Sequence, residues 1–153
     1  MIKRPRTLAI LCSLSFIYSI YGIITSLSTA ISPPEVSDEF LNSLYDQINQ
    51  YPLPIEGLGN QVESYYRNLM LNFGNYGAAN FMFYGIELVG VFLMYRLNRI
   101  GFTLYVLSQI GLAVTPVLFG GFNTFGQITL GLTLAWNGIW VVLYAFQRKH
   151  FIK

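Results

Sequence analysis

The sequence predicts an all-α integral membrane protein: a four-helix transmembrane bundle with cytoplasmic termini and a helical extracytoplasmic cap between the first two crossings. Two observations predict this fold. The chain has 153 residues, of which 54% are hydrophobic and only 10% charged, whereas an ordinary soluble domain is about 25% charged. Its basic residues lie just outside long apolar runs, and its acids gather in a different segment. We treat residues 1–153 as a single membrane domain.

The segregation of charge predicts the orientation. Of nine Lys and Arg residues only Arg67 lies in residues 32–71, and of seven Asp and Glu residues only Glu87 lies outside that segment. Basic residues concentrate in the cytoplasmic loops of membrane proteins. The two ends and the turn around Arg96 and Arg99 are therefore expected in the cytoplasm, and residues 32–71 outside.

The first crossing is predicted over residues 7–31. This apolar run of about 25 residues is long enough for a bilayer core and longer than the apolar core of a signal peptide, about 7–15 residues. An uncleaved anchor is therefore expected, although Ser28-Thr29-Ala30 could serve as a cleavage site. Cys12 is the single cysteine, which excludes an intrachain disulfide.

Residues 32–71 are predicted to form an extracytoplasmic amphipathic segment. Ser32 and Glu35 match a capping box around Pro33 and Pro34, which starts a helix. Helical spacing then gives one apolar stripe opposite an acidic face. The stripe is our candidate for a partner-binding surface, with a cap over the protein's own bundle as the alternative. It comprises Val36, Phe40, Leu44 and Ile48.

The remaining crossings are predicted over residues 73–95, 100–119 and 122–146. A tight turn at residues 96–99 joins the second crossing to the third, and Gly120-Gly121 joins the third to the fourth. Because both connections are short, these three helices should be antiparallel neighbours.

A face of small residues runs along the first crossing. It contains Cys12, Ser15, Ser19, Gly22, Ser26 and Thr29, spaced three or four apart. Small residues let membrane helices approach closely. We expect this face to pack inside the bundle, with the docking of a partner helix as the alternative. Gly131, Ala135 and Gly138 form a shorter small face on the fourth crossing that could be its mate.

One polar residue occurs at a similar depth in every crossing. Counted from the cytoplasmic ends, Ser15, Glu87, Gln109 and Asn137 lie about eight or nine residues in. At about 1.5 Å per residue this depth is about 12–13 Å. The four side chains could form one intramembrane polar layer if the helices are rotated toward one another.

Glu87 has two interpretations, because an ionisable residue within the membrane is a functional candidate by default. It could be a structural neutral acid that donates a hydrogen bond to Gln109 or Asn137. It could instead bind a proton or a cation as a substrate. The helix rotations, which the sequence leaves open, decide whether the three side chains meet.

No catalytic or cofactor motif accompanies these features. The sequence has no phosphate-binding loop, no nucleophile motif and no set of His, Cys, Asp and Glu with metal-ligand spacing. We therefore expect no enzyme, cofactor, metal site or nucleic-acid partner. The leading hypothesis is a non-catalytic accessory or scaffold subunit that sits in the lipid bilayer with other integral membrane subunits. The alternative is a small proton- or cation-coupled transporter that uses Glu87.

Two stretches carry a family resemblance. One is Lys3-Arg4-Pro5-Arg6 before an apolar helix, and the other is Arg96, Arg99, Ile100, Gly101, Phe102, Leu104 and Tyr105 with Gln109. The pattern resembles uncharacterised small four-span inner-membrane proteins of Bacteroidota. The resemblance implies a location in a bacterial inner membrane, and it implies no activity or catalytic residue.

Overall fold

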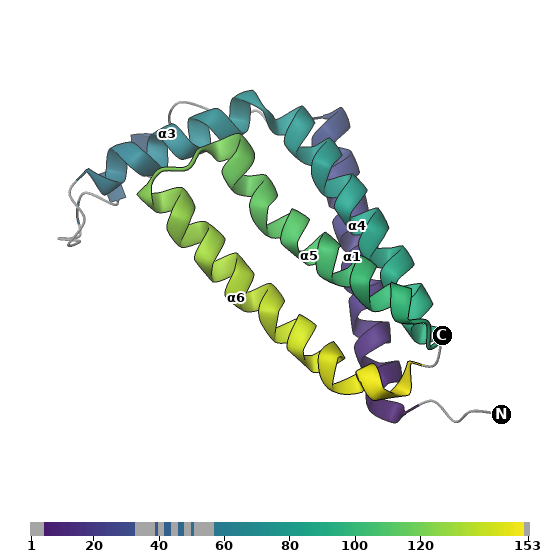
Figure 1. The fold of residues 1–153 in the computed structure, drawn as a ribbon. Helices are drawn as coiled ribbons and strands as arrows, with labels where there is room; N and C mark the ends of the chain where they lie inside the picture. Colours follow the sequence, from purple (N-terminus) through teal and green to yellow (C-terminus); the bar gives the residue numbers. More distant parts are fainter. Residues whose placement is uncertain are drawn as a thin grey trace.

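The protein is all-helical wherever its structure is described. A computed structural model describes residues 5–32, 39, 42, 43, 46, 47, 50 and 57–151. The elements are α1 (Arg6–Ile31), α3 (Leu58–Leu71), α4 (Phe73–Tyr95), α5 (Arg99–Gly120), α6 (Thr124–Gln147) and the 3-10 helix η1 (Arg148–His150) (Figure 1). Four helices, α1, α4, α5 and α6 continued by η1, are long and apolar enough to cross a membrane.

Asparagine caps set where two of these helices begin. The Asn98 side chain accepts a hydrogen bond from the Ile100 backbone nitrogen at 2.9 Å, at the start of α5. The Asn123 side chain accepts one from the Gly126 nitrogen at 2.9 Å, at the start of α6. Asparagine at this position satisfies a backbone donor that the helix cannot. α4 has the bounds expected for the second crossing, and the other three long helices differ from expectation by one or two residues at an end.

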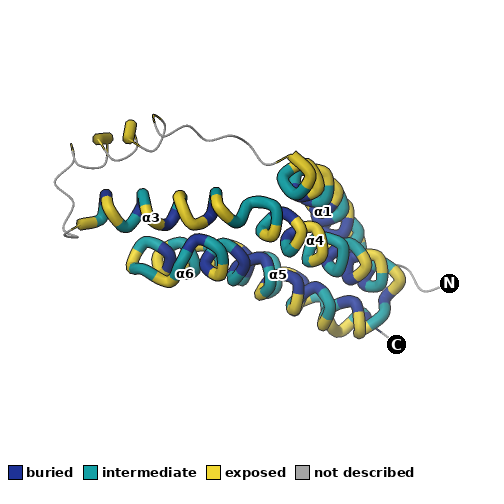
Figure 2. Tube along the Cα trace, turned by 90° about the horizontal axis from the view of Figure 1, so that it is seen from above, coloured by how far each residue is buried: buried dark blue, intermediate teal, exposed yellow. Residues whose placement is uncertain are grey.

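The long helices pack in chain order, α1 on α4, α4 on α5 and α5 on α6, and α1 and α6 make little contact with each other (Figures 1 and 2). Close approach at glycine holds the first three together. A Cβ at Gly77 of α4 would lie 2.6 Å from the Ala30 nitrogen of α1. A Cβ at Gly90 would lie 2.9 Å from the Tyr105 nitrogen of α5. Backbones this close leave no room for a side chain between them.

The small face of α1 lies against α4. Its residues Cys12, Ser15, Ser19, Gly22 and Ser26 are all buried. The ring of Tyr84 of α4 fills the space over Gly22. This face is thus occupied within the chain, and its mate is α4 rather than α6. Gly131 and Gly138 of α6 have open space where a Cβ would be.

The bundle is closed at its basic end, where both described ends of the chain lie (Figure 1). A buried cluster there comprises Leu8, Leu11, Cys12, Val91, Met94, Leu97, Tyr105, Tyr144 and Phe151. Phe151 folds back into this cluster, and its carbonyl oxygen accepts a hydrogen bond from Arg99 Nε at 3.1 Å. The segment after α6 therefore seals this end of the helices.

The helix α3 lies across the opposite ends of α5 and α6 (Figure 1). Its Tyr65 ring packs edge-on against Phe125, with 5.1 Å between ring centroids. Asn123 Nδ2 donates to the Gln61 carbonyl oxygen at 2.8 Å, and Asn68 Nδ2 donates to the Gly120 carbonyl oxygen at 3.3 Å. Burial in this contact raises the pKa of Tyr65 to about 12. α3 is thus a docked cap on α5 and α6.

The candidate partner-binding residues Val36, Phe40, Leu44 and Ile48 lie outside the described residues. The polar positions described between them are exposed, and Glu39, Asn42, Ser43, Asp46 and Gln47 have helical backbone. The Gln50 nitrogen donates to the Asp46 carbonyl oxygen at 3.1 Å, as in a helical turn.

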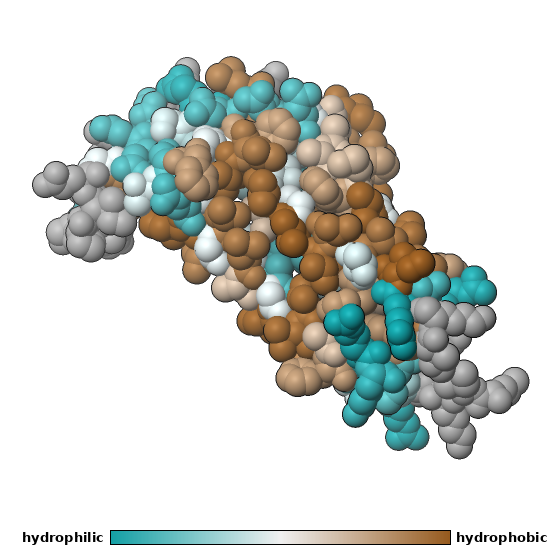
Figure 3. Space-filling view, in the orientation of Figure 1, coloured by the Kyte–Doolittle hydropathy of each residue, from teal (hydrophilic) through white to brown (hydrophobic). Residues whose placement is uncertain are grey.

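The surface carries an apolar band between two polar ends (Figure 3). Large apolar side chains are exposed along all four long helices, among them Ile17, Phe92, Leu118 and Leu132. Side chains of this kind are stable on a surface when lipid is the solvent. The fold is therefore that of a multi-pass membrane protein.

Replacing Gly90 by Ala should destabilise the bundle. The added methyl group would meet the α5 backbone, and overpacking of this kind costs about 1–3 kcal/mol. We expect a lower midpoint of thermal unfolding, followed by circular dichroism in detergent micelles.

The matched control is Gly85→Ala on the same helix, where a Cβ meets nothing within 4 Å. Alanine is favoured over glycine in a helix by up to about 1 kcal/mol, so this midpoint should stay or rise. Equal midpoints for the two variants would contradict the close α4–α5 contact.

Candidate functional site

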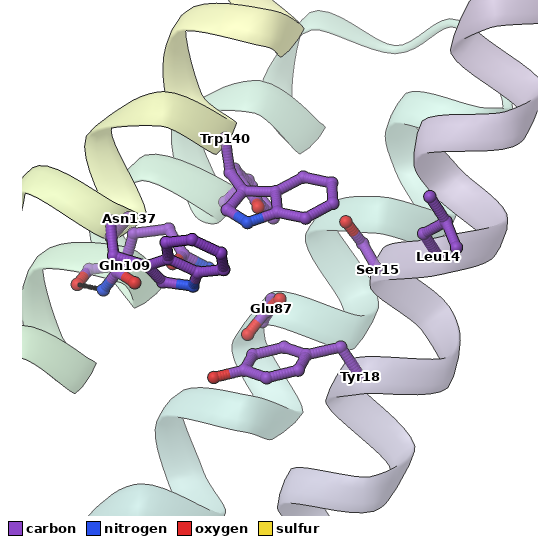
Figure 4. Close-up of a pocket in the computed structure, with 9 residues that line it drawn as sticks. Leu14, Ser15, Tyr18, Glu87, Gln109, Asn137 and Trp140 are labelled. Carbon is purple, nitrogen blue, oxygen red and sulfur yellow. Dashed lines mark hydrogen bonds between the residues drawn. The ribbon is translucent and has the colours of Figure 1, made fainter. Parts of the chain in front are cut away.

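The four residues of the predicted polar layer surround one cavity. Ser15 of α1, Glu87 of α4, Gln109 of α5 and Asn137 of α6 are buried and line a hollow of about 200 Å³ (Figure 4). The helices are therefore rotated so that these side chains face one another. The rest of the lining is Leu14, Tyr18, Tyr105, Trp136 and Trp140.

Glu87 is the one acid among the residues that line this cavity, and it is only 1% exposed. Its carboxyl group lies within hydrogen-bonding range of Ser19 and Gln109, but its Oε2 atom is buried and has no hydrogen-bond partner. No ion pair joins it to any residue that the structure describes. Burying a carboxyl oxygen without a hydrogen-bond partner costs free energy. A ligand that binds to Oε2 would offset that cost.

The Ser19 hydroxyl lies beside this carboxyl group. It donates to the Ser15 carbonyl oxygen at 2.8 Å, and its oxygen can in turn accept a hydrogen bond. The titratable side chains that interact with Glu87 are the phenols of Tyr84 and Tyr105.

Two hydrogen bonds fix the walls of the cavity. Asn137 Nδ2 donates to the Gln109 backbone oxygen at 3.0 Å, which ties α6 to α5 (Figure 4). The Tyr144 hydroxyl donates to Ser15 Oγ at 2.9 Å, which ties α6 to α1. Tyr144 also packs on Tyr105, with 4.7 Å between ring centroids. These two tyrosines separate the cavity from the basic end of the bundle.

The mouth of the cavity lies between α1 and α6. On the α1 side Leu14 and Tyr18 are both 49% exposed, and on the α6 side Trp136 is 60% exposed. Figure 4 shows Tyr18 and Trp140 reaching in from opposite sides, with Glu87 between them. The buried floor belongs to α4 and α5. The opening therefore faces sideways, toward the surroundings of the apolar band.

Gln109 and Asn137 also line a second hollow of about 160 Å³ between α5 and α6. In Figure 3 hydrophilic atoms show through the apolar surface midway along this pair of helices. The polar layer thus reaches both sides of the α5–α6 contact.

A polar hollow of about 210 Å³ lies farther along α1 and α4, toward α3. It is lined by Thr25, Ser26, Thr29, Tyr76, Gly77, Asn80 and Tyr84. The hydroxyl of Tyr84 lies 3.4 Å from that of Tyr18, which lines the Glu87 cavity. The tyrosine pair therefore lies between the two hollows.

The aromatic lining was not predicted from the sequence, although a signal for it exists. Trp136 and Trp140 flank Asn137 at the spacing i, i+1, i+4, and Leu14 and Tyr18 flank Ser15 in the same way. Residues four apart lie on one helix face, so each polar residue carries two large neighbours toward the same cavity.

The groups around the cavity can hydrogen-bond to a ligand, pair with its charge and pack against its apolar parts. One carboxyl group, two carboxamides, a serine hydroxyl and four aromatic rings surround the cavity. Within the described residues, no three His, Cys, Asp or Glu side chains are grouped as metal ligands.

Comparisons with protein-family models, with curated proteins and with solved structures found no match.

Proposed function

We propose that this protein is a small proton- or cation-coupled membrane transporter that uses Glu87 as its exchange site. The single observation that carries the proposal is the Glu87 carboxyl group, buried on the floor of a cavity with one oxygen unpartnered. Placing an acid within the bilayer costs free energy, and ionisable residues inside membrane proteins usually belong to substrate or ion sites.

The exchange would couple a proton to a cation at one carboxyl group. With the cavity empty, Glu87 carries a proton. When a monovalent cation enters, the proton leaves and the carboxylate pairs with the cation, so the site is neutral in either state. The hydroxyl groups of Tyr18 and Tyr84, 3.4 Å apart, lie between this cavity and the polar hollow toward α3.

The proposed setting is a bacterial inner membrane with both termini in the cytoplasm. Arg6, Arg96, Arg99, Arg148 and Lys149 lie at the closed end of the bundle, which the distribution of basic residues in membrane proteins favours as the inner side. α3 then caps the outer side. We propose no catalytic role.

A second candidate is an accessory subunit of a larger membrane complex, and the exposure of α6 favours it. Only Gly126, Asn137 and Tyr144 are buried along that helix. Around Gly131 the surface is open enough for another helix backbone to approach.

Replacing Glu87 by Gln should abolish cation-driven proton movement, because the amide cannot exchange a proton. Purified protein would be reconstituted into liposomes that contain a pH-sensitive dye and are acidic inside. Sodium, potassium or an organic ammonium salt would be added outside. Wild-type vesicles should become less acidic with a coupled cation, and Glu87→Gln vesicles should match protein-free ones.

Glu63→Gln is the control for that measurement, because Glu63 pairs with Arg67 on the surface of α3, far from the cavity in the chain's fold. It should transport like the wild type. The transporter proposal would be contradicted if Glu87→Gln moved protons at the wild-type rate. It would also be contradicted if wild-type protein moved no protons with any of the cations.

The accessory proposal predicts a native species much larger than the 17.3 kDa chain after mild extraction from its own membrane. Gly131→Leu puts a bulky side chain on the exposed face of α6. It should lower the mass of that species because it blocks the approach of a partner helix. Gly85→Leu, at an equally open position of α4, should not. A small species from the wild type, or one unchanged by Gly131→Leu, would count against a partner on α6.

A further inference from the structure

The walls around Glu87 are mostly aromatic. Tyr18 comes from α1, Tyr105 from α5, and Trp136 and Trp140 from α6, which places rings on three of the four helices around one acid. The face of an aromatic ring attracts cations within about 6 Å of its centroid, and tryptophan does so best. Rings of this kind around a carboxyl group favour an ammonium ion that carries carbon substituents.

The cavity is a poorer match for a bare metal ion. Calcium takes six to eight oxygen ligands, and magnesium keeps a near-octahedral shell that includes water. Here the oxygen atoms come from Glu87, Gln109, Asn137, Ser15 and the tyrosine hydroxyls, and the exposed rim at Leu14 and Trp136 offers carbon instead. A neutral apolar ligand would leave Glu87 Oε2 without a partner.

The volume of the cavity and the position of its mouth restrict the class of ligand further. An apolar protein cavity of about 150 Å³ can hold benzene, so about 200 Å³ has room for a ring and part of a substituted ammonium group. The mouth opens between α1 and α6 across half-exposed apolar and aromatic side chains. A ligand that dissolves partly in the bilayer can reach it directly from the side.

We propose that the Glu87 cavity binds an organic ammonium ion with an aromatic or alkyl substituent, which enters from the bilayer between α1 and α6. The ammonium group pairs with the Glu87 carboxylate, and its substituents lie against Tyr18 and Trp140. This inference rests on the proposed exchange function, for which it names the substrate class.

The native tryptophans of the chain allow ligand binding to be followed by fluorescence. Its two tryptophans, Trp136 and Trp140, both line the cavity, so a saturable change in intrinsic tryptophan fluorescence reports binding at this site. Full-length protein in lipid nanodiscs would be titrated with benzyltrimethylammonium. The matched probe is neopentylbenzene, which has the same shape with carbon in place of the charged nitrogen.

We expect saturable fluorescence changes with benzyltrimethylammonium in the wild type and in Glu63→Gln, and an affinity at least about tenfold lower in Glu87→Gln. Trp140→Leu, followed through Trp136, should also weaken binding because it removes a cation–π contact. Neopentylbenzene should bind more weakly than the cation, and Glu87→Gln should not weaken it further. Circular dichroism would establish that each variant is folded.

Three results would overturn the inference: no saturable change in folded wild-type protein, equal affinity for the two probes, or cation affinity unchanged in Glu87→Gln. If sodium or potassium still drives proton flux that depends on Glu87, the exchange function stands and only the organic class fails. If the organic cation binds through Glu87 but no cation drives flux, the ligand class stands and transport fails.

Discussion

The rest of the structure depends on one constraint, the burial of the Glu87 carboxyl group in an apolar bundle without an ion partner. An acid within the bilayer costs a few kcal/mol on insertion scales, and this one has an oxygen that no described group satisfies. Ser15, Gln109 and Asn137 are gathered around it from the other three helices. Interhelical hydrogen bonds of this kind contribute about 0.6 kcal/mol each on average. This is less than the free energy needed to place the acid in the bilayer. The proposed ligand at Glu87 Oε2 would offset that cost.

The cavity follows from an asymmetry in how the helices pack. Small residues on α1 and glycines on α4 and α5 bring these three backbones close together. α6 carries Trp136 and Trp140 on the corresponding side, is tied to α5 midway by the Asn137 hydrogen bond, and makes little contact with α1. Tyr144 binds it to Ser15 near the basic end, and Phe125 packs under α3 at the other. Because α6 packs on α5 but barely touches α1, the space above Glu87 stays open between α1 and α6.

Much of this arrangement could be predicted from the sequence, because membrane solvent imposes simple rules. Four long apolar runs predict four long helices, and counting from their basic ends places Ser15, Glu87, Gln109 and Asn137 at one depth. Rotation could not be predicted, because helices that are apolar on every side carry no amphipathic signal. For the same reason the small face of α1 could be expected inside the bundle, but α4 could not be told from α6 as its mate.

The aromatic part of the site was missed for a related reason. Trp136, Trp140 and Tyr18 fit equally well as interfacial anchors, which is where such residues gather in membrane proteins. Only their spacing around Asn137 and Ser15 distinguishes them from interfacial anchors. That spacing indicates a cavity lining only when Asn137 and Ser15 are known to face a cavity. The acidic stretch between α1 and α3 lies largely outside the described residues, so its partner-binding stripe stays a prediction.

The most direct test of the central claim is chemical labelling of Glu87 in the bilayer. Diisopropylcarbodiimide is small, apolar and reactive toward protonated carboxyl groups, and mass spectrometry identifies the residue that it modifies. If Glu87 carries a proton and faces a cavity open to the side, it should be labelled, whereas a charged, water-soluble carbodiimide should label only acids at the polar ends, such as Glu63. Failure of the apolar reagent to modify Glu87, in protein whose Glu63 reacts normally with the soluble one, would contradict the account.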